Sequence, residues 1–309
     1  MMASRLDITA IFCDVDDFYL QCSKLWQQQK QLPSMPDEKR CHSRLSLSEA
    51  MTIVIAFHGS GFKTFKEFYT LQVLPHWKRA FPKLVSYNRF VELMPWCLML
   101  LCCFLQTRRG EVTGISFIDS TPIEVCHPCR SRSHKVFKNI AGWGKNSMGW
   151  HYGFKLHLII NDKGELLAFK LTPGNVDDRK PVPEMTPDII GQLFGAPRSG
   201  SLRDRGYISQ ELFEELYQRQ LQLITRYKKK MKQKLVKLID KIMLRKRSLI
   251  ETVNDQLKNI SQIEHSRHRS VWNFLVNLLA GLTAYTYLPH KPSLDLDPKA
   301  LSALPPAVF

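Results

Sequence analysis

The hydrophobic pattern of this chain changes near Gly110, and that change limits the possible folds more than any other feature. Before it, apolar residues recur at helical intervals. Beyond it, three apolar runs have strand character: ISFID (115–119), WHYGFKLHLIIN (150–161) and ELLAFKLTP (165–173). The NDKGE sequence between the last two is typical of a hairpin turn. The pattern predicts a helical region followed by a domain built on a sheet.

Two further strands are expected downstream. A short strand should end in SLRD (201–204), a helix should cover 209–218, and LQLIT (221–225) has the composition of a last strand. The expected fold class is α/β, with a mixed five-stranded sheet and flanking helices. An amphipathic pattern from Leu235 to Ile260 and an apolar run over 271–285 predict two more helices.

The first third of the chain is predicted to be helical. Ser46 and Glu49 have the spacing of a capping box at the start of a helix over 46–58, and several prolines separate the helices that follow. A helix-turn-helix and a plain helical bundle both fit this pattern. The expected organisation is a helical N-terminal domain that could bind DNA ends, a sheet domain and a Pro-rich tail, over 1–110, 111–288 and 289–309.

The charge of the chain indicates a polyanionic partner. Lys and Arg number 44 against 28 Asp and Glu, which gives a net charge of +16. Eleven basic residues and one acidic residue lie within 226–247, so this basic run carries ten of the sixteen net charges. Among them, Lys228, Lys229, Lys230, Lys232 and Lys234 are candidate phosphate contacts.

Two other settings for a basic protein are not favoured. Asp14, Asp16 and Asp17 interrupt the N-terminal apolar run, so we expect no secretory signal. The apolar stretch from Leu93 to Leu105 is shorter than the ~20 residues of a membrane span, so we expect no membrane partner. The eight cysteines show no disulfide framework, and reduced thiols in a bacterial cytoplasm, close to the nucleoid, are expected. The CHPC at 126–129 fits either half of a zinc site or ordinary residues.

Three carboxylates stand where catalytic carboxylates usually stand. Asp119 ends the strand in FIDSTP, Asp204 follows the short strand in RDRGYIS, and Glu251 lies on the predicted long helix. Cleavage of a phosphodiester by two cations about 3.5 to 4 Å apart needs such oxygen ligands. The three residues are therefore candidate catalytic residues and ligands for two Mg²⁺ or Mn²⁺ ions.

The surroundings of Glu251 strengthen this interpretation. Arg247 lies four residues before it and Lys258 seven after it. At 100° per residue the three side chains share one helix face, with the two cations separated by roughly 16 Å along the axis. This arrangement suits the holding of DNA phosphates beside bound metals.

A second candidate for the middle aspartate lies in PGNVDDRKP. Asp177 and Asp178 follow a predicted strand, and their carboxylates could instead cap the next segment or pair with Arg179 and Lys180. Asp204 is preferred because it ends the fourth strand, which we expect beside the first. Asp178 is then expected to have an accessory role.

Weaker signals for DNA binding follow the first strand. Arg130, Arg132, Lys135 and Lys138 fit either a backbone-tracking segment or a solvated loop. Trp143, Trp150 and Tyr152 alternate with glycines and basic residues, which suits either stacking on an unpaired base or packing in a core.

The order FIDSTP, TPGNVDDRKPV, RDRGYIS and R-x3-E-x6-K resembles the DDE transposases of bacterial insertion sequences, and the segment from 125 to 181 is similar to the insertion sequence nine-eighty-two family. The resemblance covers 11–287. It implies an RNase H-like fold and cutting and joining of DNA at terminal inverted repeats, with target DNA as second substrate and a homodimer in the synaptic complex. Asp119, Asp204 and Glu251 carry the catalytic positions, and Arg247 and Lys258 the accessory ones.

Two residues depart from the family pattern. Leu244 stands where the fuller signature has tyrosine, and Arg203 replaces the glycine that usually precedes the second aspartate. These departures leave two alternatives: an inactive copy that only binds DNA, or an RNase H-like nuclease that does not join strands.

Overall fold

The structure is a computed structural model in which two compact units are formed. One unit comprises Met1–Arg108 with Gln256–Pro289, and the other comprises Arg109–Asp255 with His290–Phe309. The residues described are 6–28, 44–146, 149–195, 207–225, 236–237, 243–244, 246–264, 268–294 and 306–307.

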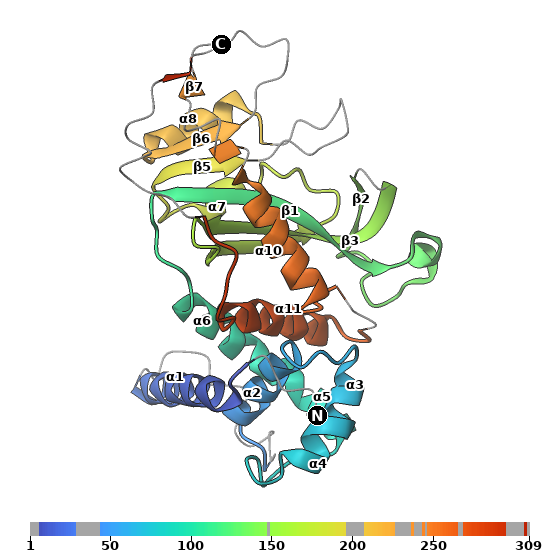
Figure 1. Cartoon of the computed structure of the whole chain (residues 1–309). Coiled ribbons are helices and arrows are strands. Elements are labelled where there is room, and N and C mark those ends of the chain that lie inside the picture. Colours follow the sequence, from blue (N-terminus) through green and yellow to red (C-terminus); the bar gives the residue numbers. More distant parts are fainter. Residues whose placement is uncertain are drawn as a thin grey trace. The chain divides into compact units, whose positions relative to one another are not determined.

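A six-stranded mixed sheet is the framework of the second unit (Figure 1). Its order is β2-β3-β1-β5-β6, with β4 paired to β3. The β1–β3, β2–β3 and β3–β4 pairs are antiparallel, whereas β1–β5 and β5–β6 are parallel. The strands are β1 (Ile115–Cys126), β2 (Gly142–Asn146), β3 (Gly149–Asn161), β4 (Leu166–Pro173), β5 (Gly191–Gly195) and β6 (Leu221–Thr225).

The expected number of strands, five, was wrong, because β2 and β5 are rich in glycine and do not have a strand composition. Close contacts explain these glycines. A Cβ on Gly144 of β2 would lie 2.4 Å from the His151 ring, and a Cβ on Gly191 of β5 would lie 2.3 Å from the carbonyl oxygen of Gly114. The strand beside β1 is β5, whereas the expected strand over 201–204 lies outside the described residues.

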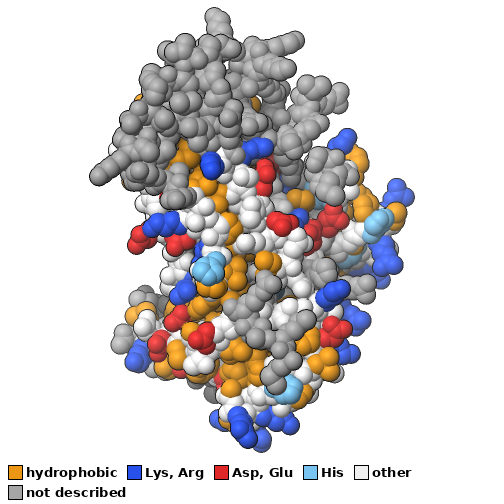
Figure 2. All heavy atoms as spheres, in the orientation of Figure 1, with side chains coloured by type: hydrophobic (Ala, Val, Ile, Leu, Met, Phe, Trp, Pro, Cys, Tyr) orange, Lys and Arg blue, Asp and Glu red, His pale blue; other side chains and the backbone are white. Residues whose placement is uncertain are grey.

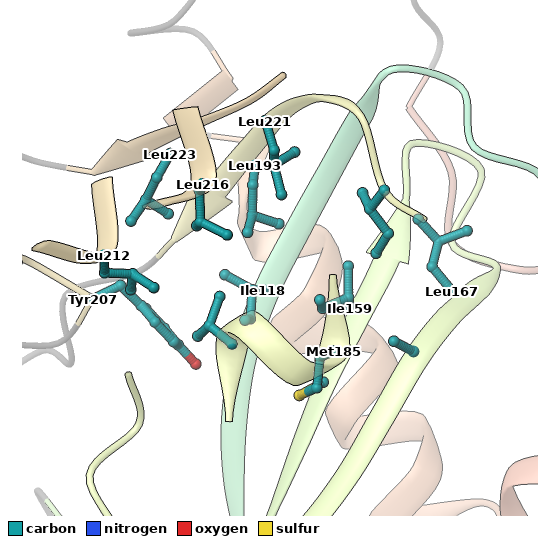
Figure 3. Packing of buried hydrophobic residues seen from close by; sticks show 13 residues of the cluster. Ile118, Ile159, Leu167, Met185, Leu193, Tyr207, Leu212, Leu216, Leu221 and Leu223 are labelled. Atoms are coloured by element: carbon teal, nitrogen blue, oxygen red, sulfur yellow. The ribbon is translucent and has the colours of Figure 1, made fainter. Parts of the chain in front are cut away.

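One face of the sheet is covered by two short helices, α7 (Val182–Met185) and α8 (Gln210–Gln218). Their apolar side chains and those of the strands form one buried cluster (Figure 3), which includes Ile118, Ile159, Leu193, Leu212 and Leu216. The expected helix over 209–218 is confirmed, with the Ser209 hydroxyl accepting a hydrogen bond from the Leu212 amide at its start. Burial of each large apolar side chain contributes about 1.5–3 kcal/mol, so this cluster fixes the sheet on α7 and α8.

The segment before the candidate catalytic helix differs from expectation. The helix predicted from Leu235 is not continuous, because Val236–Lys237 forms strand β7 and pairs with β8 (Pro306–Ala307). Lys and Arg at four-residue spacing in this run disfavour a helix by mutual repulsion. Helix α10 spans Ser248–Asn259. The tail also contacts the sheet unit, since the amide of Leu294 donates a hydrogen bond to the carbonyl of Asp162.

The first unit is helical. The predicted capping box is confirmed at α2: the Glu49 amide donates to the Ser46 hydroxyl at 3.1 Å and the Ser46 amide to the Glu49 carboxylate at 2.8 Å. The helical elements are α1 (Ile8–Gln28), α2 (Leu47–Phe57), α3 (Phe65–Glu67), the π-helical η1 (Phe68–Val73), α4 (Leu74–His76), α5 (Tyr87–Leu93), the 3₁₀ turn η2 (Met94–Cys97), α6 (Leu98–Thr107) and α11 (Val271–Thr286).

Helix α11 belongs to this unit, although the expected sheet domain extended to residue 288. Its side chains from Phe274 to Tyr285 are almost all buried, and it packs against α6 and α2. A helix that is apolar on every side needs partners all around it, and the apolar faces of α2 and α6 supply them.

Within the described residues, one helical run, Tyr87–Thr107, has the length and apolar composition to cross a membrane. It exceeds the apolar stretch noted in the sequence because α5, η2 and α6 follow one another directly. Phe90, Leu93, Leu101 and Phe104 on this run are buried inside the unit, which is the packing of a core helix.

Candidate active site

Asp119 lies inside β1, which continues to Cys126, so the expectation that it ends the strand was wrong. Ile118 points into the α7–α8 cluster, so Asp119 points to the opposite face because side chains alternate along a strand. Its carboxylate is half-buried, and its Oδ2 accepts a hydrogen bond of 3.0 Å from Nδ2 of Asn254 on α10. Helix α10 therefore lies beside β1 on the face that carries Asp119.

Helix α10 is held by an apolar stripe. Leu249, Ile250 and Val253 are buried, whereas Ser248, Glu251, Thr252 and Asp255 are exposed. Glu251 occupies the first turn, where the helix dipole favours a negative charge. It lies three residues before Asn254, so the two side chains stand one above the other on the helix. Asn254, the residue that contacts Asp119, therefore lies one turn along α10 from Glu251.

Asn254 was missed by the sequence analysis. Asn254 is 7% exposed, and its Oδ1 atom has no hydrogen-bond partner among the described residues. A polar residue inside an apolar helix stripe is the signal that could have found it, because such residues usually serve a specific contact. Leaving a buried amide oxygen without a partner costs about 1–3 kcal/mol.

The donors around Asp119 suit a hard cation. Mg²⁺ and Mn²⁺ prefer oxygen ligands. The candidates here are the carboxylates of Asp119 and Glu251 and the amide oxygen Oδ1 of Asn254, which has no hydrogen-bond partner among the described residues. Within the described ranges no cluster of three His, Cys, Asp or Glu residues is close enough to hold a metal. Asp204 lies outside those ranges, so the proposed three-carboxylate set is only partly visible.

The residues on either side of the Asp204 segment can be placed. Gly195, the last residue of β5, pairs with Ile118, the residue before Asp119. Tyr207 is buried against Gly195, since a Cβ there would lie 3.0 Å from the tyrosine ring. Tyr207 belongs to the same buried cluster as Ile118, so the chain after β5 resumes on the face of the sheet opposite to Asp119.

The alternative aspartates lie elsewhere. Asp178 is buried, and its Oδ1 accepts a hydrogen bond of 2.9 Å from Nζ of Lys155, which also donates to the carbonyl of Val176 at 2.8 Å. Lys155 on β3 is three residues from Leu158, the partner of Asp119, so its side chain points to the opposite face. The Lys155–Asp178 pair is thus separated from Asp119 by the sheet.

Asp177 is held by its neighbour Arg179. The guanidinium donates to both carboxylate oxygens, at 2.8 and 2.6 Å, and lowers the pKa of Asp177 to about 2. The same Arg179 donates a hydrogen bond of 3.4 Å to the carbonyl of Ile208. Arg179 therefore connects the β4–α7 loop, which carries Asp177, to Ile208 at the start of the segment that leads into α8.

The two predicted accessory cations differ in their partners. Arg247 NH2 lies 3.5 Å from Oε1 of Glu251, and the glutamate side chain is 54% exposed. Lys258, at the other end of α10, pairs instead with Glu264, 3.2 Å away. Arg247 is therefore the cation that the structure places beside Glu251.

The predicted phosphate contacts are described only in part. Arg130, Arg132, Lys135 and Lys138 are all exposed on and after the 3₁₀ segment η3 (Pro128–Ser133). Cys126 and Cys129 are free thiols without a described metal cluster around them. The predicted contacts that lie outside the described residues are Lys228, Lys229, Lys230, Lys232 and Lys234.

A family model described as transposase DDE domain matches residues 109–271. The chain belongs to the DDE transposase family. The matched range contains β1 with Asp119 and the whole of α10, so the hydrogen bond between Asp119 and Asn254 lies inside the family domain. No curated protein and no solved structure matches the chain. For a DDE transposase the class of activity is DNA cleavage and transfer, and the substrate is DNA.

Proposed function

We propose that this transposase cuts DNA at the terminal inverted repeats of an insertion sequence of the nine-eighty-two family and joins the freed 3′ ends to target DNA. The observation that carries the proposal is the contact between Asp119 and α10, which brings the carboxylate on β1 next to the helix of Glu251. Asp119, Asp204 and Glu251 are the proposed catalytic residues and metal ligands.

Two bound Mg²⁺ or Mn²⁺ ions would supply a nucleophilic oxygen at neutral pH and would stabilise the leaving oxygen. The protein residues have separate tasks in this scheme. Asn254 holds one oxygen of Asp119 and thereby directs the other toward the reaction centre. Arg247 and Lys258 hold DNA phosphates along α10, and the 226–247 run attracts the DNA backbone through its ten net positive charges.

The partners follow from this scheme. Double-stranded DNA with the terminal repeats is the first substrate and target DNA the second. Synapsis of two DNA ends calls for a homodimer. The accessible cations Arg130, Arg132, Lys135 and Lys138 are proposed to contact the DNA backbone near the β1–β2 connection.

A strand-transfer assay tests the proposal. The full chain is incubated with Mg²⁺, a labelled DNA duplex from the flank of its reading frame and a supercoiled target plasmid. A transposase yields labelled DNA covalently joined to the plasmid. Cleavage without joined product would indicate a simple nuclease, and DNA binding without cleavage would indicate an inactive copy.

A further inference from the structure

The β2–β3 hairpin carries two exposed tryptophans on one face. The strands pair Trp143 with Tyr152 and Lys145 with Trp150, which places these four side chains on the same side of the ladder. Trp143 is 42% exposed and Trp150 is 60% exposed. Their rings lie 6.5 Å apart, and Nζ of Lys145 lies 5.5 Å from the Trp150 ring.

The exposure of these rings argues against a role in the core. Tyr152 beneath them is buried, and its ring packs 5.5 Å from that of Trp143. Tyr152 also donates a hydrogen bond to the carbonyl of Phe137, which fixes its position beneath the two indoles. Trp143 and Trp150 together are called the platform below. Leaving two indoles in water forgoes the free energy that burial of such large apolar surfaces provides, which suggests that a ligand covers them.

The charge around the platform selects the ligand. Residues 127–150 contain five Lys or Arg and no Asp or Glu. Figure 2 shows Lys and Arg side chains gathered at the edge of the molecule where Figure 1 has the β1–β2 connection. A second copy of this surface would repel the first, whereas a nucleic acid strand is attracted. Exposed aromatic rings among cations are the usual platform for unpaired bases.

The platform shares a sheet face with Asp119. Trp150, Tyr152 and Leu158 have the same parity along β3, and Leu158 is the partner of Asp119 on β1. Eight residues of strand separate Trp150 from Leu158, which is about 26 Å. This length corresponds to about eight base pairs of DNA. Phe154, Leu156 and Leu158 on this face are buried, so a DNA strand bound at Asp119 would reach the tryptophans around the groups that cover this part of the sheet.

We propose that Trp143 and Trp150, with Lys145, form a stacking site for unpaired bases of the DNA strand at a distance of about 26 Å along β3 from the level of Asp119. The DNA strand is the one that the proposed function supplies, so the inference rests on that function. The stacking site predicts an effect on DNA binding, which can be measured without catalysis. A preference for single-stranded over duplex DNA is expected to depend on the two indoles.

Fluorescence anisotropy of the full chain in EDTA tests this site. The probes are a mixed-sequence oligonucleotide of about 16 nucleotides and its duplex, each with a fluorescent base analogue that stacking quenches. We expect Trp143→Ala/Trp150→Ala to weaken single-strand binding roughly tenfold and to abolish quenching, while duplex binding changes less than about twofold. Trp150→Tyr should retain most of the affinity because a phenol ring also stacks.

The matched control is Trp272→Ala on α11, an exposed tryptophan that should leave both affinities unchanged. Unchanged single-strand affinity in the double variant would overturn the proposal. Equal weakening toward single strand and duplex, or a change from dimer to monomer without an effect on DNA, would also overturn it. Thermal unfolding of Trp150→Tyr and of the double variant shows whether any loss comes from misfolding. Because metal is absent, a chain without cleavage activity still gives a readable result.

Discussion

Nδ2 of Asn254 on α10 donates a 3.0 Å hydrogen bond to Oδ2 of Asp119 on β1. This contact connects the strand and the helix that carry two of the three proposed catalytic carboxylates. It also accounts for a polar residue inside the apolar stripe of α10, between the buried Ile250 and Leu257. The geometry makes Asn254 a positioning residue for Asp119.

Replacement of Asn254 by alanine should lower metal affinity and cleavage about 10- to 100-fold, because an outer partner of a ligand sets its orientation. The free energy of unfolding should fall by about 1–3 kcal/mol, since one buried hydrogen bond is lost. Manganese binding by calorimetry and urea unfolding measure the two effects. Thr252→Ala, at an exposed position of the same helix, is the control and should change neither. Normal metal affinity in Asn254→Ala would contradict the positioning role.

Glu251→Gln should separate stability from activity. The Glu251–Arg247 pair is 3.5 Å long and its carboxylate is mostly exposed, so its loss should cost less than about 1 kcal/mol. Cleavage should fall at least about 100-fold if the carboxylate is a metal ligand. Cleavage kinetics and chemical denaturation of the same preparation give both numbers. A variant that cleaves like the wild type would remove Glu251 from the active site.

Asp178→Asn should destabilise the protein by about 3–5 kcal/mol, because Lys155 would be left buried without its counterion. Asp204→Asn should abolish cleavage. Urea unfolding combined with a cleavage assay compares the two variants. The double variant Lys155→Met/Asp178→Leu should regain most of the stability. A stable Asp178→Asn protein without cleavage activity would make Asp178 a ligand in place of Asp204.

The helical unit should lose stability in acid. Burial lowers the pKa of both His58 and His268 to about 4. Because both pKa values lie below the ordinary 6.5 of the unfolded chain, the unfolded state binds more protons between these values. The stability is therefore fully present above about pH 6.5 and is lost as the pH falls toward 4, by roughly 2–3 kcal/mol per histidine.

Urea unfolding at several pH values between neutrality and about pH 4 measures this loss. His58→Asn keeps a donor for the carbonyl of Ser261, which the Nδ1 of His58 contacts, and should flatten the pH dependence. His76→Gln, at an exposed position of the same unit, should leave it unchanged. An unaltered pH profile in His58→Asn would contradict the assignment.

The sequence predicted those parts of the fold that local patterns determine. The capping box of Ser46 and Glu49 and the strands that carry Asp119 and Lys155 have regular patterns that local physics explains. The glycine-rich strands β2 and β5 were missed because their glycines are required by close contacts with neighbouring strands and loops, such as Gly114 against Gly191. Such contacts leave no periodic signal in the sequence.

The candidate site was predictable to a similar extent. Asp119 and Glu251 could be chosen as carboxylates on a predicted strand and a predicted helix. The spacing of Arg247 predicted that it shares a helix face with Glu251, and the two side chains pair there. Asn254 could not be chosen by type, because asparagine is a common surface residue. The sequence also could not show that Asp178 and Asp119 lie on opposite faces of the sheet, because this depends on the register between β1 and β3.

The central claim is that Asp119 and α10 form a metal-dependent centre for DNA cleavage. A magnesium titration of cleavage on DNA with a terminal repeat, with wild type and Asp119→Asn side by side, tests it most directly. We predict magnesium-dependent cleavage by the wild type, none by Asp119→Asn, and equal DNA binding by both. Equal cleavage by the two proteins, or cleavage by the wild type in EDTA, would contradict the account.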